Sequence, residues 1–257
     1  MMEKETKVSY REGRASHVGM TSRVKTGIDG FDELVLGGFP RGNSILVTGG
    51  TGTGKSTFAL QFVYKGAKVY DEAGIYVTLE ESIPSIIKNA ASYGWEIEDL
   101  EQAGKLAMID VSPAVSGQLR KISPTDIYSN VSQICKKIGA KRIVVDPITV
   151  MGMQFESSVD MRLDLLRFAS LLKQLEATVL FVTEISEESQ ALSRFGIEEF
   201  ISDGVVVLYY SKVGGLRVRG IEVRKMRGTA HKEGIFPIKM GETGLSVYPS
   251  AKVPKLS

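Results

Sequence analysis

The segment Gly49–Ser56, which reads Gly-Gly-Thr-Gly-Thr-Gly-Lys-Ser, constrains the possible folds of this chain more than any other feature. It matches the pattern G-x-x-x-x-G-K-[ST], in which glycines let backbone N–H groups surround a phosphate without interference from side chains. The apolar run Ser44–Thr48 before it predicts a strand, and the pattern Lys55–Val69 after it predicts a helix. Strand, glycine-rich loop and helix in this order predict a phosphate-binding loop at a helix N-terminus.

The residues of this loop have different expected roles. Lys55 is expected to reach the β- and γ-phosphates and to act in catalysis, and Ser56 to bind Mg²⁺. The other contacts to the nucleotide are expected from Gly49, Gly50, Thr51, Gly52, Thr53, Gly54 and Thr57. The sequence therefore predicts a P-loop NTPase that binds ATP or ADP together with Mg²⁺.

A carboxylate that could complete the Mg²⁺ site follows a second apolar strand. The run Arg142–Val145 is followed directly by Asp146. In a parallel sheet, the C-terminal ends of the strands meet at the crevice that also holds the phosphate-binding loop. We therefore expect Asp146 to lie near Ser56 and to bind Mg²⁺ with it.

Two adjacent glutamates, Glu80 and Glu81, follow the strand predicted at Ile75–Leu79. At this edge of the sheet they would face the γ-phosphate, so Glu80 is the candidate that orients or deprotonates water, with Glu81 as its neighbour. They could instead act as negative charge at the N-terminus of the helix that begins near Pro84. Both roles are compatible with the sequence.

Apolar runs of strand type alternate with helical patterns along most of the chain, which predicts an α/β fold with a mostly parallel sheet flanked by helices. The remaining helices are expected at Pro84–Tyr93, Pro124–Ile138 and Val159–Leu175, the last with an apolar stripe that includes Leu163 and Leu166. The remaining parallel strands are expected at Leu106–Ile109, Thr178–Thr183 and Val205–Tyr210. Strand-like runs without intervening helices, Leu216–Met226, Ile235–Met240 and Leu245–Tyr248, predict a C-terminal antiparallel extension. Residues 1–20 are expected to form a flexible arm, and residues 21–257 a single domain.

Composition limits the partners and the compartment. With 32 basic and 30 acidic residues among 257, the net charge of +2 is far from that of a protein that coats DNA. The single cysteine, Cys135, cannot form an intramolecular disulfide and is expected to be buried. The N-terminus is charged, and no apolar run approaches the 18 or so residues of a membrane span, so we expect a cytoplasmic protein without a membrane partner.

Beyond the loop, several motifs give the chain a family resemblance. It resembles the KaiC-like branch of the RecA-type ATPases from about Ser22 to Pro249. The motifs that carry this resemblance are Thr26–Asp32, Gly37–Gly42, the phosphate-binding loop, Glu80-Glu81, Thr183-Glu184 and Lys225–His231. The resemblance implies a single RecA-like domain that assembles into a ring, as a homohexamer, with ATP at each subunit interface.

The resemblance also implies residues that act across that interface. Lys225 and Arg227 would reach the γ-phosphate bound by the neighbouring subunit, and His231 would contact the same nucleotide. An arginine or lysine at the transferring phosphoryl group neutralises the charge that develops there. Taken without the resemblance, these residues are better explained as part of a solvated basic strand, since Arg217, Arg219 and Arg224 lie in the same region.

Two functions are compatible with such a site. The first is a slow, Mg-dependent ATPase, a hydrolase that acts as a nucleotide-dependent regulatory or scaffold protein with a protein partner that the sequence does not identify. The alternative is a DNA recombination or repair ATPase of the RecA/RadA type. In that class, the segments corresponding to 151–162 and 184–200 line a central channel, and here both contain more acidic than basic residues. Acidic loops repel phosphate, so we expect no DNA binding through them, although the basic face of Leu216–Arg227 is compatible with nucleic acid.

Overall fold

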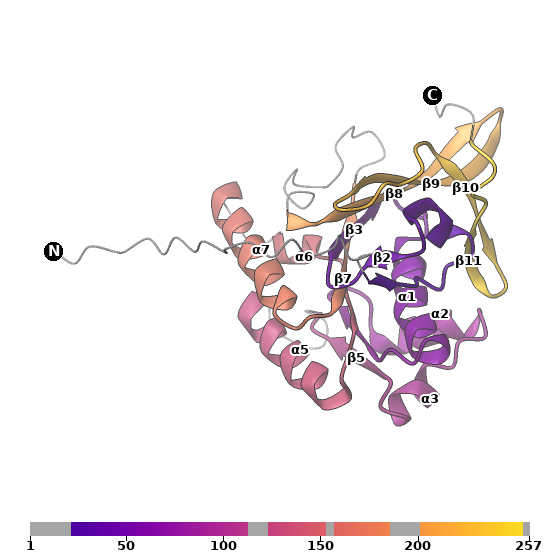
Figure 1. The fold of residues 1–257 in the computed structure, drawn as a ribbon. Coiled ribbons are helices and arrows are strands. Elements are labelled where there is room, and N and C mark those ends of the chain that lie inside the picture. Colours follow the sequence, from indigo (N-terminus) through magenta and orange to yellow (C-terminus); the bar gives the residue numbers. More distant parts are fainter. Residues whose placement is uncertain (1–21, 113–122, 153–156, 186–200, 254–257) are drawn as a thin grey trace, which may run out of the picture.

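The structure is a computed structural model that describes residues 22–112, 123–152, 157–185 and 201–253 (Figure 1). The expected flexible arm lies outside the described residues. So do most of the segment 184–200 and part of the segment 151–162, on which the expectation about DNA depends.

A nine-stranded sheet with the order β11-β10-β9-β8-β3-β7-β6-β4-β5 forms the centre of the described fold. The strands from β3 to β8 are parallel, and the three C-terminal strands pair antiparallel at one edge. The parallel strands are β3 (Ser44–Gly49), β4 (Gly74–Thr78), β5 (Leu106–Asp110), β6 (Arg142–Asp146), β7 (Thr178–Glu184) and β8 (Gly204–Val213). The antiparallel strands are β9 (Leu216–Met226), β10 (Phe236–Gly241) and β11 (Gly244–Val247). The predicted fold class, a mostly parallel sheet with a C-terminal antiparallel extension, is confirmed.

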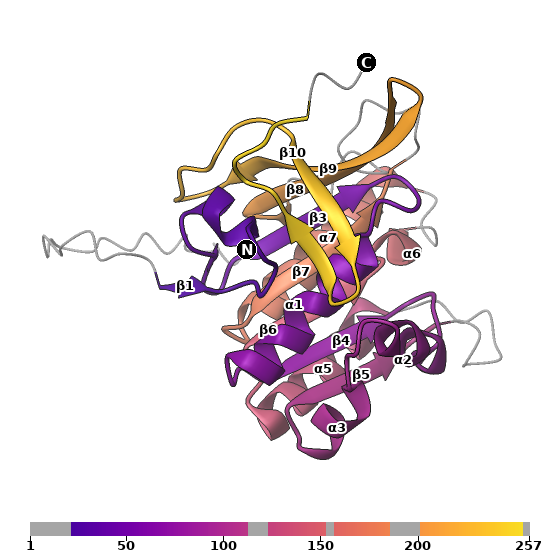
Figure 2. The same ribbon diagram turned by 90° about the vertical axis from the view of Figure 1, so that its right-hand side faces the viewer.

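Helices cover both faces of the sheet and create two apolar cores (Figure 2). The helices on one face are α1 (Lys55–Val69), α2 (Ile83–Ala91) and α3 (Ile97–Gln102), with the 3₁₀ helix η1 (Phe31–Val35) and the short pair β1 (Arg23–Val24) and β2 (Phe39–Pro40). Those on the other face are α5 (Pro124–Ile138), α6 (Thr149–Gly152) and α7 (Ser158–Lys173). Successive residues of β3 alternate between the cores, since Ile45 and Val47 pack with α1 whereas Leu46 packs with α5 and α7.

The expected helix at Val159–Leu175 is present as α7, but its apolar stripe is partly wrong. Leu165, Phe168 and Leu172 are buried, whereas the side chains of Leu163 and Leu166 are 46% and 37% exposed. Leucines occur on more than one side of this helix, so periodicity alone did not identify the face that packs on the sheet. Cys135 is a free, buried cysteine, as expected.

The two ends of the sheet carry different parts of the chain. The C-terminal ends of β3, β4, β6 and β7 lie at one end, where the phosphate-binding loop begins. Strand β8 runs parallel to β3 with Gly204 beside Ile45, and β9 returns antiparallel with Lys225 beside Val205. The C-terminal end of β9 therefore lies at the opposite end of the sheet from the loop. Among the residues that the structure describes, no helix is long and apolar enough to span a bilayer.

Candidate functional site

The phosphate-binding loop connects β3 to α1 and depends on glycine at two positions. Gly52 has φ +73° and Gly54 has φ +102°, left-handed values that favour glycine strongly. Thr53 Oγ1 donates a 2.9 Å hydrogen bond to the Gly50 carbonyl, which braces the loop internally. Thr57 lies in the first turn of α1. The loop thus has the backbone conformation of an anion cradle at a helix N-terminus.

Lys55 lies under this loop and is almost fully buried. Its Nζ donates a 2.8 Å hydrogen bond to the Gly50 carbonyl and is 3.7 Å from Glu184 Oε1. Burial lowers the pKa of Lys55, while the nearby carboxylates of Glu184 and Asp146 oppose this shift. The ammonium group is therefore held beside the loop by several acceptors.

Asp146 lies at the end of β6, where it is 7% exposed. Its carboxylate accepts a hydrogen bond from the Tyr76 hydroxyl and interacts with the Ser56 side chain. Burial raises the pKa of Asp146, and the hydrogen bonds from Tyr76 and Ser56 only partly counteract it. The structure thus brings Asp146 and Ser56 together, although they are far apart in the sequence.

This pair of oxygen donors fits Mg²⁺. The ion prefers carboxylate and hydroxyl oxygens and is commonly bound by one or two protein ligands, with water and phosphate oxygens completing the coordination. The described part of the chain contains no group of three or more His, Cys, Asp and Glu residues that could hold a metal on its own. Two protein ligands leave the remaining coordination positions to water and phosphate oxygens, which suits an ion that binds together with a nucleotide.

The two glutamates have different environments. The Glu81 carboxylate accepts hydrogen bonds from Ser85 Oγ at 2.6 Å and Asn89 Nδ2 at 2.9 Å, both on α2. Glu80 is exposed, and within the described residues its carboxylate has no hydrogen bond or ion pair. The Glu81 side chain is thus hydrogen-bonded to α2. The Glu80 carboxylate, without such partners among the described residues, is exposed to solvent.

A cavity of about 390 Å³ connects these groups. It is lined by Lys55, Ser56, Tyr76, Thr78, Glu80, Glu81, Ile86, Asp146, Pro147 and Glu184. An exposed glutamate, a lysine and a candidate Mg²⁺ site therefore share one space next to the loop, an arrangement compatible with phosphoryl transfer to water.

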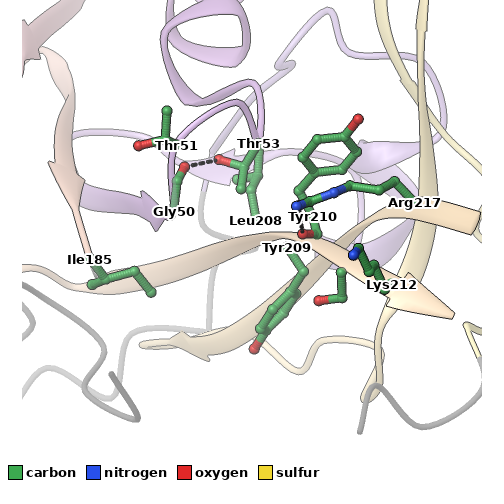
Figure 3. A pocket seen from close by; sticks show the side chains of 10 residues that line it. Gly50, Thr51, Thr53, Ile185, Leu208, Tyr209, Tyr210, Lys212 and Arg217 are labelled. Atoms are coloured by element: carbon green, nitrogen blue, oxygen red, sulfur yellow. Dashed lines mark hydrogen bonds between the residues drawn. The ribbon is translucent and has the colours of Figure 1, made fainter. Parts of the chain in front are cut away.

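A second cavity, also of about 390 Å³, lies between the loop and the hairpin of β8 and β9 (Figure 3). Tyr209, Tyr210 and Lys212 from β8 and Arg217 from β9 line it, facing Thr51 and Thr53. The hairpin also contacts the loop directly, because Nε of Arg219 donates a 3.1 Å hydrogen bond to the carbonyl of Gly52. The same guanidinium lies 4.1 Å from the centre of the Tyr210 ring, a cation–π contact.

Lys225 and Arg227 do not reach the loop within one chain. Lys225 Nζ donates to the Ser202 carbonyl at 2.7 Å, and Arg227 Nη1 is 3.5 Å from Asp203 Oδ1, both at the far end of the sheet. His231 follows in the segment between β9 and β10. Because β3 rises about 3.3 Å per residue, its two ends are roughly 16 Å apart.

Sequence reasoning did not assign Tyr76 or Glu184 to the site, although Thr183-Glu184 was among the motifs that carry the family resemblance. Tyr76 occupies an apolar strand, and its buried hydroxyl required a polar partner, which could have pointed to the neighbouring strand end. Glu184 ends β7 in the same way that Asp146 ends β6, so the rule that identified Asp146 also applied to Glu184.

A parallel sheet with this loop after β3, an aspartate at the end of β6 and a glutamate after β4 defines a P-loop ATPase of the RecA type. A family model described as "ATPase: KaiC" matches residues 24–252, and the chain belongs to this family.

Known relatives agree with this assignment. The chain is 38% identical to the circadian clock oscillator protein KaiC of Parasynechococcus marenigrum, over 88% of this chain and 45% of that protein. It is 39% identical to that of Synechococcus elongatus, over 89% of this chain and 44% of that protein. The chain thus spans about half the length of these relatives. A solved structure, the KaiC-like protein of the hyperthermophilic archaeon Pyrococcus horikoshii, is similar with a TM-score of 0.80 and 40% identity, covering 90% of this chain and 100% of that one.

Proposed function

We propose that this protein is a slow, Mg-dependent ATPase whose complete active site forms only between two copies of the chain in a homohexameric ring. The observation that carries this proposal is the position of Lys225 and Arg227 at the end of the sheet opposite the phosphate-binding loop. Their separation from the loop, roughly 16 Å along β3, exceeds the reach of an arginine side chain. They can therefore act on a phosphate only if it is bound by a neighbouring subunit.

Within one subunit, the chain supplies the groups that bind and activate. The loop amides and Lys55 would bind the phosphates, and Ser56 and Asp146 would hold Mg²⁺. The bound ion would neutralise charge on the phosphate oxygens. Glu80 would orient the attacking water and accept its proton, a role that suits its exposed carboxylate in the shared cavity. Arg227 and Lys225 of the next subunit would stabilise the charge that develops on the γ-phosphate.

The biological role that we propose is regulatory: a cytoplasmic, nucleotide-dependent scaffold whose assembly and hydrolysis control the binding of a protein partner. The name of the relatives, circadian clock oscillator protein, supports a regulatory output rather than a motor. A turnover assay with and without single-stranded DNA tests this role. Slow turnover that DNA leaves unchanged agrees with the scaffold, whereas strong stimulation by DNA would favour a recombinase.

The shared site is tested by mixing two inactive variants. Arg227→Ala subunits retain an intact phosphate-binding loop, and Lys55→Ala subunits retain an intact Arg227. When the two assemble together, some interfaces combine both intact halves, so activity should recover. Light scattering confirms that mixed rings form, and Arg224→Ala serves as the matched control, since this exposed arginine of β9 pairs with Glu222 and should leave turnover unchanged. Assembled mixtures that stay inactive at several ratios would contradict a shared site.

A further inference from the structure

The carboxylate of Asp203 connects three separate parts of the chain at the far end of the sheet. It accepts hydrogen bonds from the backbone N of Ser44 at 3.0 Å and from Ser44 Oγ at 3.1 Å, at the start of β3. It lies 2.9 Å from Nζ of Lys173, the last residue of α7, and 3.5 Å from Nη1 of Arg227. Only 12% of its side chain is exposed.

The residues Ser202 and Asp203 together hold both of the basic residues proposed to act across the interface. The Ser202 carbonyl accepts from Lys225 Nζ, and the Asp203 carbonyl accepts from the backbone N of Arg227 at 2.9 Å. The Asp203 carboxylate then faces the Arg227 side chain. One short segment before β8 therefore sets the position of both cations.

The contact with Arg227 orients the guanidinium without burying it. At 3.5 Å it is longer than the contacts of Asp203 with Ser44 and Lys173, and 63% of the Arg227 side chain stays exposed. A guanidinium has five N–H donors. One terminal nitrogen contacts Asp203, and the other donors have no hydrogen-bond partner among the residues that the structure describes, so they can bind a group outside this subunit.

Asp203 is itself held by Ser44 and Lys173 and stays ionised. Burial alone would raise the pKa of its carboxyl, but hydrogen bonds from Lys173 and Ser44 outweigh burial, and the pKa lies below its ordinary value. The carboxylate also pairs with two cations, Lys173 and Arg227, and so offsets the repulsion between them.

We propose that Asp203 is a positioning residue for hydrolysis in the neighbouring subunit: it fixes the Arg227 guanidinium in the orientation that meets the neighbour's γ-phosphate. The proposal rests on the shared site proposed above. Long side chains lose rotamer freedom when they are fixed, so an arginine that is already oriented loses less at the moment of reaction. Asp203 thus acts through Arg227 and touches no substrate.

The test distinguishes two contributions of a subunit: the Arg227 side chain that it supplies to its neighbour, and the ATP that its own phosphate-binding loop binds. Asp203→Asn keeps the size of the side chain and an acceptor for Ser44 but loses the charge that orients Arg227. Rings of this variant should turn over about 10- to 100-fold more slowly, with an unchanged KM for ATP, because their own loops are intact. When Asp203→Asn subunits are mixed with Lys55→Ala subunits, the Lys55→Ala subunits supply a correctly oriented Arg227. Activity should then recover, as we expect for the mixture of Arg227→Ala and Lys55→Ala subunits.

Asp164→Asn is the matched control. It removes an aspartate from another aspartate–arginine pair, in which Asp164 lies 3.2 Å from Arg167 on α7, and should leave turnover unchanged. If Asp203→Asn rings do not assemble, Asp203→Ser, which retains a hydroxyl for Ser44, replaces them in the same mixture.

The possible outcomes distinguish this inference from the function on which it rests. If Lys55→Ala subunits restored the activity of Arg227→Ala subunits but not that of Asp203→Asn subunits, Asp203 would serve the loop of its own subunit. That outcome would leave the shared site intact and overturn this inference. Wild-type turnover in Asp203→Asn rings would overturn it too, as would loss of assembly in both Asp203 variants. Failure of the Arg227→Ala mixture itself would overturn the shared site.

Discussion

Among the individual residues, Asp146 is the clearest case of a side chain that the proposed site requires but that lowers the stability of the folded protein. Its carboxylate is almost fully buried beside Tyr76, and burial raises its pKa above that of an exposed aspartate. The folded state therefore binds a proton at Asp146 more tightly than the unfolded state does, so the ionised carboxylate lowers the free energy of unfolding at neutral pH. A site for Mg²⁺ requires this charge in spite of that cost.

We predict that Asp146→Asn raises the melting temperature at pH 7 in the absence of metal and nucleotide, and abolishes Mg-dependent turnover. Asparagine can still accept from the Tyr76 hydroxyl but carries no charge to bury. The advantage should fade as the pH falls through the raised pKa of Asp146, because the native carboxyl then becomes neutral as well. Thermal melts between pH 7 and the acid limit of folding measure this difference.

Asp203→Asn should show the opposite sign in the same melts. The pKa of Asp203 is lowered despite burial, so its ionised form adds stability above the pKa of an unfolded aspartate. That stability is lost as the pH falls through the lowered pKa.

A lower melting temperature for Asp146→Asn than for the native protein at pH 7 would contradict the account of Asp146.

The adjacent glutamates give a second prediction for single residues. Glu80→Gln should retain nucleotide binding but lower turnover by roughly 10²–10⁴-fold, the usual contribution of a positioned general base. Glu81→Gln is the matched control, since the Glu81 carboxylate is bound by Ser85 and Asn89 and should affect the stability of α2 more than turnover. Steady-state assays and ADP titration of both variants test the assignment, and an inactive Glu81→Gln beside a normal Glu80→Gln would exchange the roles.

Residues that belong to a motif could be predicted from the sequence, and residues that act only through tertiary contacts could not. Lys55 and Ser56 have fixed places in the loop pattern, and Asp146 follows an apolar strand. Tyr76 and Asp203 have no such local signal. Their roles depend on which strands become neighbours, and strand order is not encoded in any one segment.

Among the elements, the hairpin of β8 and β9 has a more direct role than its sequence indicated. Strand β9 was predicted as part of the antiparallel extension, and Leu216–Met226 has the expected bounds. Strand β8 was predicted separately, as the parallel strand Val205–Tyr210, and it extends further in the structure. Periodicity could not show that Arg219 of this hairpin contacts the carbonyl of Gly52. Short elements were missed for a related reason: α3 and α6 span less than two turns, too few for a periodic signal.

We predict that Arg219→Ala weakens ADP binding about three- to tenfold without changing turnover at saturating ATP. The arginine supports the conformation of the loop, and the loss of one hydrogen bond changes a free energy by about 1 kcal/mol. Arg217→Ala is the control, because its guanidinium bonds to the Tyr210 carbonyl and not to the loop. Isothermal titration measures both variants, and equal losses in the two would indicate a general charge effect rather than support of the loop.

For the whole molecule, the proposed function assigns complementary halves of one site to the two ends of the sheet. The loop end presents the cavity with Lys55, Glu80 and Asp146, and the opposite end presents Arg227, held by Asp203. When copies of the chain associate head to tail, each contact joins two different surfaces. Such an assembly closes into a ring if the rotation between neighbouring subunits allows it. Activity should then be a property of the assembly, with the nucleotide as part of the interface.

This arrangement predicts that specific activity depends on protein concentration. Below the concentration at which subunits assemble, each loop lacks the neighbour's Arg227, so turnover per subunit should fall steeply, whereas a self-contained site would give a constant value. A ligand that binds only the assembled form shifts the equilibrium toward it by mass action. Added ATP should therefore move the loss of activity to lower protein concentrations, and Lys55→Ala subunits, which bind nucleotide poorly, should show no such shift in light scattering. Constant turnover per subunit across a dilution series in which scattering reports dissociation would rule out the shared site.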